Sequence, residues 1–234
     1  EEIIELNANF FSAEREVKRT KGIHLSHVID YIEGKQRQAE LSKAGNNFAV
    51  GGYLWERALD KIIHLTPSEL WEYVFTQALF EIAKPDVFRP GEQCMDAGEC
   101  PACAGKGVYI EPVRVCSICE GCGRIRIYLT PDGVSITDSC LEEWKYTSKS
   151  CRDVNLSGPK FNRWTNWQIP AYLKALNLYT CRLRVYFSRG DYKSGQPEWH
   201  QYIITYTQQE IDEIWEMIQR NAIALVQHVE LDGK

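Results

Sequence analysis

The core of this chain is expected around residues 124–150, which read RIRIYLTPDGVSITDSCLEEWKYTSKS. Basic and apolar residues alternate from Arg124 to Leu129, as they do in a half-buried strand. The residues Thr130-Pro131-Asp132-Gly133 have the composition of a turn, and Cys140 to Tyr146 predicts a second short strand. We expect these two strands to pair with each other as a hairpin.

Three polar side chains of this hairpin would meet at one point. Alternate side chains of a strand share a face, so Glu143 and Lys145 point together while Trp144 points into the opposite layer as a core residue. The hairpin would bring Asp132 beside Glu143. Hard carboxylate oxygens suit Mg2+ or Mn2+, ions that polarise a phosphodiester and lower the pKa of a bound water. Lys145 would orient or deprotonate that water and offset the charge that develops on the phosphate.

Two alternatives stay open for this cluster. Glu-x-Lys is a common pattern, which a surface hairpin with a cross-strand salt bridge explains without any chemistry. Asp138 is the second choice for the first carboxylate, but only four residues separate it from Glu143, which fits the connecting turn better than the facing strand. The ten residues between Asp132 and Glu143, and Gln168-x-x-x-Tyr172 downstream on a predicted helix, favour the catalytic interpretation with Asp132.

Helices are predicted on both sides of this segment. Apolar positions recur at helical spacing in HLSHVIDYI (residues 24–32) and in FAVGGYLWERALDKIIHL (residues 48–65). The capping box Thr66-Pro67-Ser68-Glu69 would open a third helix that ends at Lys84-Pro85. Further along the chain we expect a helix at 166–175, strands at 181–188 and 200–206, and a last helix opened by the capping box at 207–210.

Residues 86–123 are rich in Gly, Pro and Cys, so we expect no core secondary structure there. Two copies of CxxCxGxG begin at Cys100 and Cys116, a pattern that resembles the DnaJ zinc-finger motif. Two such knuckles make a closed tetrahedral site for one structural zinc ion. The expected ligands are Cys100, Cys103, Cys116 and Cys119.

Other interpretations of the cysteines stay open. Cys119-x-x-Cys122 is a competing CxxC pair, which the glycine pattern disfavours, and Cys94 has no assigned role. An iron–sulfur cluster or metal-free thiols would replace the zinc ion in two further alternatives. With the zinc interpretation, the chain divides into an N-terminal helical part (1–93), a zinc-hairpin insertion (94–123) and a catalytic core (124–234).

Composition limits the class of protein. A chain of 234 residues with 44% apolar residues can bury one sizeable core. It contains no apolar run of the roughly eighteen residues that a membrane helix needs, and its first thirty residues are too charged for a secretory signal. We therefore expect a cytoplasmic protein. In such a reducing compartment, five of nine cysteines crowded between Cys100 and Cys122 indicate a metal rather than disulfides.

The charge of the chain is unevenly distributed. From Lys145 to Lys193, ten Lys and Arg stand against two acids, a surplus of +8 that leaves −13 elsewhere in a chain of net charge −5. Such a basic segment predicts phosphate binding, and a solvated face is the alternative. Aromatic residues beside it are candidates for stacking on bases. The DNA-binding candidates are Lys149, Arg152, Lys160, Arg163, Trp164 and Trp167.

A second metal site is conceivable near the start of the chain. His24, His27 and Asp30 follow one another at three-residue spacing on a predicted helix. A solvated helix face is the favoured interpretation, because no fourth ligand is visible nearby.

In their order and spacing, these motifs resemble the PD-(D/E)xK nuclease superfamily, and within it the RecB-like and YqaJ-like viral recombinases of the lambda exonuclease type. The Gly-x-x-x-Glu of that family matches Gly52 to Glu56, and its Ser/Thr-Pro-Asp-Gly matches 130–133. Its Glu-x-Lys matches 143–145, and its Gln-x-x-x-Tyr matches 168–172. The resemblance implies an α/β (α+β) fold with a restriction-endonuclease-like mixed sheet flanked by helices. It also implies that Glu56, Asp132 and Glu143 hold the catalytic metal, and that Gln168 and Tyr172 support the active site.

The sequence therefore predicts a Mg2+- or Mn2+-dependent DNA nuclease, most simply an exonuclease that resects DNA ends in phage-type recombination, replication or repair. A structure-specific endonuclease is the alternative among nucleases, and a non-catalytic zinc-bearing scaffold that binds nucleic acid is the alternative outside them. The intact set of two acids and a lysine argues against the scaffold. A single-strand-annealing or replication protein is a candidate partner, and the rings of lambda-type relatives make a homo-oligomer a further candidate by analogy.

Overall fold

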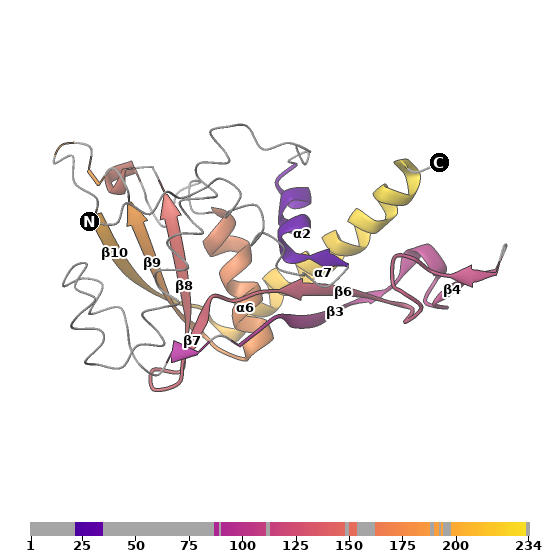
Figure 1. Cartoon of the computed structure of the whole chain (residues 1–234), viewed down its shortest axis with the longest axis horizontal. Coiled ribbons are helices and arrows are strands. Elements are labelled where there is room, and N and C mark those ends of the chain that lie inside the picture. The colour runs from indigo at the N-terminus through magenta and orange to yellow at the C-terminus, as the bar shows by residue number, and fades with distance from the viewer. Residues whose placement is uncertain are drawn as a thin grey trace, which may run out of the picture.

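The computed structural model describes residues 22–34, 87–88, 90–110, 113–147, 150–153, 162–187, 190–191, 193 and 198–232. These residues form an α+β structure in which a larger sheet lies at one end and a cysteine-rich ribbon at the other (Figure 1). The helices predicted at 48–65 and 66–84, and with them Glu56, lie outside the described residues. The mixed sheets and helices of the described residues confirm the α/β (α+β) class that the sequence predicts.

The larger sheet has five strands in the order β10-β9-β8-β7-β2. Its strands are β2 (Val87–Phe88), β7 (Gly133–Ser135), β8 (Cys140–Thr147), β9 (Thr180–Phe187) and β10 (Glu198–Thr205). The β8–β9 pair is parallel and the other pairs are antiparallel, so the sheet is mixed as predicted. The strands β9 and β10 begin and end within two residues of the predicted ranges.

The predicted hairpin between residues 124–129 and 140–146 is wrong. The first segment, β6 (Arg124–Leu129), instead lies between β1 (Ile23–His24) and β3 (Gln93–Glu99) in a separate three-stranded sheet. The antiparallel hairpin partner of β8 is the short strand β7, which follows the TPDG turn. Ten residues separate β6 from β8, enough for β7 and a tight turn, and the closer partner in sequence pairs more readily.

The expectation that residues 86–123 hold no core secondary structure is also wrong. The strand β3 forms a long antiparallel ladder with β6, interrupted by a register shift between Asp96 and Gly98. The sequence of β3 has a weak apolar pattern, because only Ala97 among its residues is fully buried. Most of the buried face of this sheet comes from β6. Ladder hydrogen bonds, which composition does not reveal, account for the strand.

Beyond the ends of β3 and β6 lies the cysteine ribbon, at the far end of the molecule from the five-stranded sheet (Figure 1). It consists of the 3-10 turn η1 (Pro101–Cys103) and a small hairpin of β4 (Val108–Tyr109) and β5 (Arg114–Val115). The two longer strands therefore act as an arm that carries the ribbon.

The helices lie along these sheets. Helix α2 (Leu25–Ile32) matches the predicted helix, and a π-helical segment η3 (Asn162–Gln168) leads into α6 (Ile169–Leu176), which covers the predicted 166–175. A further 3-10 turn, η2 (Cys151–Asp153), follows β8. Among the described helices, none is long and apolar enough to span a bilayer.

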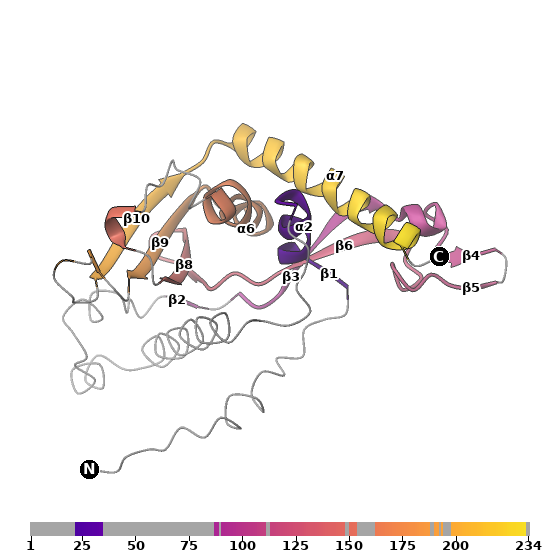
Figure 2. The same ribbon diagram turned by 90° about the horizontal axis from the view of Figure 1, so that it is seen from above.

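The last helix, α7 (Gln208–Asp232), joins the two ends of the molecule. The predicted capping box opens it, since Glu210 Oε2 accepts from Thr207 N at 2.8 Å and Thr207 Oγ1 accepts from Glu210 N at 3.2 Å. Its buried residues form one stripe at helical spacing: Ile211, Trp215, Ile218, Ala222 and Val226. Figure 2 shows α7 running from α6 past α2 to the arm and the ribbon, and its contacts with α6, α2, β3 and η1 agree.

Candidate active site and four-cysteine centre

The predicted acid-acid-lysine set comes together in space. Glu143 and Lys145 alternate along β8 and share a face, and the Lys145 ammonium donates to Glu143 Oε1. Asp132, just before β7, accepts at Oδ2 from the Trp144 backbone N–H at 2.9 Å and faces Lys145 Nζ at 3.5 Å. The Lys145 ammonium thus lies against both carboxylates, although the hairpin expected to assemble them does not exist. Trp144 itself is buried, as predicted.

Two residues of the neighbouring helix hold Glu143 in place. Gln168 Nε2 donates to Glu143 Oε1 at 3.0 Å and to the Tyr172 hydroxyl at 3.0 Å. Gln168 and Tyr172 are one helical turn apart, at the junction of η3 and α6, so they reach the same point. The sequence interpretation of this pair as support for the site agrees with these contacts.

The site opens into a pocket. A cavity of about 250 Å³ is lined by Asp132, Lys145, Gln168 and Tyr172 on one side. The other walls come from β6 with its following turn and from the start of α2. They consist of Tyr128, Leu129, Thr130, His24, Leu25 and Ser26. Sequence reasoning missed Tyr128 as a lining residue, although the alternation of β6 places it on the exposed side of that strand.

Burial and charge decide the protonation state of the site. Burial alone would lower the pKa of Lys145, but the charges of Asp132 and Glu143 outweigh it and raise that pKa above its ordinary value. Burial, followed by the charge of Glu143, raises the pKa of the Tyr172 hydroxyl. The pocket therefore presents a fixed ammonium and a neutral phenol beside the carboxylates.

The rival carboxylate, Asp138, is turned elsewhere. It accepts from the Arg182 guanidinium, which also donates to Glu142 Oε1 at 2.6 Å. Glu142 alternates with Glu143 on β8, so this charge network belongs to the opposite face of the sheet. Of the two aspartates, Asp132 alone contacts Lys145.

Acidic partners engage much of the basic segment. Arg163 contacts Asp30 at 2.6 Å and Glu33 at 3.2 Å, both on α2. Arg152 contacts Asp191 at 2.6 Å. Lys149 and Lys160 lie outside the described residues. Trp164 and Trp167 are half-buried against the core.

The partners of Arg163 lie far away in sequence, so a local charge count cannot reveal them, whereas Asp191 is one of the two acids in the segment itself. DNA binding by this segment stays a prediction. The contact with Arg163 also occupies Asp30, and His27 Nδ1 accepts from the His24 backbone N–H at 3.4 Å. The favoured interpretation of these residues as a solvated helix face is wrong for His24, which is buried and lines the pocket at Asp132.

The four predicted cysteines of the ribbon form a cluster. All four sulfur atoms lie within 4.8 Å of one another, with Cys100 and Cys116 at 3.9 Å and Cys103 and Cys119 at 3.7 Å. All four residues are buried, whereas Cys122 is exposed and stays outside the cluster, as the glycine pattern predicts. Four converging sulfurs are the donor set of a structural zinc site, so the cluster can hold a metal ion such as zinc.

Glycines give the ribbon its shape. The backbone N–H groups of Gly107 and Gly123 donate to the sulfurs of Cys103 and Cys119 at 3.2 and 3.3 Å. Both glycines have positive φ, and a Cβ on either would lie 2.2 Å from a carbonyl oxygen of the opposite knuckle. Although burial alone raises it, hydrogen bonds with the backbone at Cys119 and Ile118 help lower the pKa of Cys116 to about 7, whereas burial raises the pKa of Cys100 and of Cys119.

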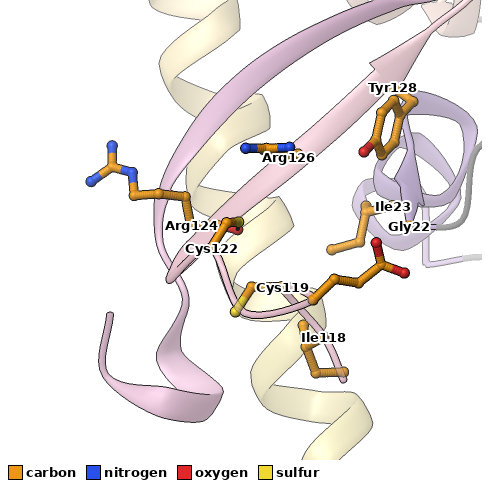
Figure 3. Close-up of a pocket in the computed structure, with 9 residues that line it drawn as sticks. Gly22, Ile23, Ile118, Cys119, Cys122, Arg124, Arg126 and Tyr128 are labelled. Atoms are coloured by element: carbon orange, nitrogen blue, oxygen red, sulfur yellow. Dashed lines mark hydrogen bonds between the residues drawn. The ribbon is translucent and has the colours of Figure 1, made fainter. Parts of the chain in front are cut away.

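A second, smaller pocket lies between the ribbon and the arm (Figure 3). Its volume is about 110 Å³, and Arg124, Arg126 and Tyr128 line it from the outer side of β6. The sulfur-bearing loop contributes Cys119 and Cys122. Because Tyr128 also lines the pocket at Asp132, this strand connects the ribbon with the candidate active site.

Comparisons with known proteins do not identify a function, so a functional hypothesis for this chain rests on the geometry described above. No family model matches the sequence, and no curated protein matches it. Six chains of solved structures match, among them "Crystal structure of SSO0001", with a TM-score of 0.48 and 12% identity over 92% of this chain and 81% of that chain. A likeness at that score and identity carries no conclusion about the chemistry of this chain.

Proposed function

We propose that this chain is a Mg2+-dependent DNA nuclease with a restriction-endonuclease-like core, acting as an exonuclease in phage-type recombination, replication or repair. The observation that carries the proposal is that Lys145 contacts the carboxylates of both Asp132 and Glu143, beside the pocket that Asp132 and Lys145 line. Glu143 is fully buried, and the side chains of Asp132 and Lys145 are 17% and 14% exposed. Burying charged carboxylates lowers the free energy of unfolding. Such a cost is typical of a functional site and is not expected of a surface salt bridge.

The donor set fits the proposed metal. Asp132 offers hard carboxylate oxygens at the pocket wall, the buried carboxylate of Glu143 lies behind that wall against Lys145, and the resemblance adds Glu56. When bound, Mg2+ would supply Lewis-acid polarisation of the phosphodiester and a water of lowered pKa. The Lys145 ammonium contacts both carboxylates, which supports a cation at this position.

Each protein group then has a definite task. Lys145 is fixed as an ammonium that can donate to a phosphate oxygen and stabilise the charge gained during cleavage. Gln168 holds the orientation of Glu143 from the helix side. The backbone N–H of Trp144 fixes Asp132 in the same way. The pocket walls at Tyr128 and His24 would border the scissile strand.

One experiment tests the activity directly. The full chain is incubated with Mg2+ and either end-labelled linear DNA or closed circular DNA. An exonuclease degrades the linear DNA and spares the circle, whereas cleavage of both would indicate the endonuclease alternative. Glu143→Gln and Lys145→Ala should abolish cleavage while DNA binding in Ca2+ survives. Absence of any cleavage with Mg2+ or Mn2+ would leave the scaffold alternative.

A further inference from the structure

A second group of metal-binding side chains lies at the edge of the five-stranded sheet. It consists of Cys151 in η2 with Glu198 and His200 in β10. One ligand atom of each residue lies within 4.8 Å of the other two, and all three residues are half-buried. None of them belongs to the motifs that the sequence analysis identified, because 47 residues separate Cys151 from Glu198.

The fold brings these residues together from two directions. Glu198 and His200 alternate along β10 and therefore share a face of the sheet. The segment after β8 is tethered by a hydrogen bond from Cys151 N to Gly190 O at 3.1 Å, which places the thiol over that face. Strand pairing thus fixes Glu198 and His200, whereas Cys151 is held by its hydrogen bond to the turn at Gly190.

The hydrogen bonds of the three side chains converge on one atom. The Cys151 thiol lies 3.2 Å from Glu198 Oε2, and His200 Nε2 lies 2.9 Å from the same oxygen. A Cys–His nucleophile would instead need the thiol to face the imidazole. A thiol, an imidazole and a carboxylate directed at one point are the donors that zinc and similar ions take once the two protons are displaced.

Neighbouring groups orient the His200 imidazole, and the nearby arginine pairs with a different carboxylate from that of Glu198. The Tyr202 hydroxyl lies 3.4 Å from His200 Nδ1, the kind of outer contact that fixes the tautomer of a metal-binding histidine. The Phe187 ring packs edge-on against the imidazole at 5.2 Å between centroids. The nearby Arg152 guanidinium contacts Asp191 instead of Glu198.

We infer that Cys151, Glu198 and His200 bind a divalent transition-metal ion of the zinc class, at a site separate from the four-cysteine centre. Three protein ligands leave the fourth tetrahedral position for water or another small ligand, unlike the closed ribbon site. The register places His200 and Lys145 on the same rung and face, with Val185 of β9 between them. Two inter-strand steps separate their backbones by about 10 Å. The inference does not depend on the proposed nuclease activity.

Metal stoichiometry of the full chain tests the site. After equilibration with buffered Zn2+, the wild-type protein should hold two zinc ions, whereas Cys151→Ser and His200→Ala should each hold one. Cys94→Ser is the matched control, because Cys94 is an exposed cysteine outside both clusters, and it should hold two. Co2+ bound at both sites should give a thiolate absorption band that becomes weaker in Cys151→Ser and unchanged in Cys94→Ser, because the four-cysteine centre supplies the rest of the band. Equal zinc content in the wild type and in both site variants would overturn the inference.

A second measurement needs no variant and so does not depend on folding of the substituted chains. Alkylation of each cysteine in the wild-type protein is followed by peptide mass spectrometry with and without Zn2+. A bound ion should slow the alkylation of Cys151 and leave the rates of Cys94 and Cys122 unchanged. Equal rates at Cys151 in both conditions would exclude the site.

Discussion

At the scale of single residues, the geometry of the pocket depends on hydrogen bonds between protein side chains that do not themselves bind substrate. Gln168 is a positioning residue, because its side-chain amide donates hydrogen bonds to Glu143 and to the Tyr172 hydroxyl. Gln168→Leu should lower kcat by about 10- to 100-fold, the usual effect of losing such an outer contact, with little change in KM. Gln201→Leu on the exposed side of β10 is the control and should keep wild-type kcat. Wild-type kcat in Gln168→Leu would remove it from the site.

The choice between the two aspartates is also a residue-level question. Asp132 contacts Lys145, whereas Asp138 contacts Arg182 on the other face of the sheet. Asp132→Asn should therefore abolish cleavage, while Asp138→Asn should retain it with some loss of stability. Single-turnover cleavage rates with Mg2+ make the comparison. An inactive Asp138 variant beside an active Asp132 variant would transfer the role to Asp138.

At the scale of elements, the capping box of α7 makes a quantitative prediction. Hydrogen bonds from the backbone and side chain of Thr207 lower the pKa of Glu210. A lowered folded-state pKa contributes stability that is present above the unfolded value of about 4.3 and is lost as the pH falls further. Thr207→Ala should cost about 1 kcal/mol in the free energy of unfolding at neutral pH. The difference from wild type should shrink in acid.

Urea denaturation at pH 7 and at acidic pH measures this difference. Gln209→Ala, an exposed change in the same helical turn, should stay within about 0.5 kcal/mol of wild type at both pH values. A pH-independent cost for Thr207→Ala would show that the carboxylate of Glu210 takes no part.

Elements with a strong local pattern could be predicted from the sequence, and elements made by distant pairing could not. The apolar spacing of α2 and the alternation of β9 place both within a residue or two. The alternation of β6 also identifies a strand, but its partner β3 has one fully buried residue and no visible pattern. Pairing of strands far apart in sequence depends on a ladder of backbone groups that every sequence possesses.

The candidate site shows the same limit at the scale of the whole molecule. The motifs predicted that Asp132, Glu143, Lys145 and Gln168 lie together, and their contacts agree, even though the expected hairpin is wrong. The charge count could not reveal that Arg163 contacts acids of α2 about 130 residues away. The cluster at Cys151 was invisible because its members come from separate elements.

At the scale of the whole molecule, strand β6 connects the cysteine ribbon with the pocket at Asp132. The strand β6 begins directly after Gly123 of the second knuckle and ends one residue before the turn that carries Asp132. Its buried residues Ile125, Ile127 and Leu129 pack in the same core as α7, which contacts the ribbon at η1. Loss of the metal that the four cysteines can hold would therefore disturb Asp132 through the arm, although four thiolates leave no position for a reacting water.

Cys103→Ser should accordingly lose one tightly held zinc ion per chain, lower the melting temperature and reduce cleavage, because binding free energy at such a site is folding free energy. The Mg2+ concentration for half-maximal activity should stay unchanged in the activity that remains, since the carboxylates themselves are intact. Cys122→Ser is the control and should alter none of these quantities, because its exposed thiol lies outside the cluster. Elemental analysis, thermal denaturation and Mg2+ titration of cleavage separate the effects. Iron in place of zinc would contradict the zinc assignment, and full activity of the zinc-free variant would show that the arm does not transmit the loss to Asp132.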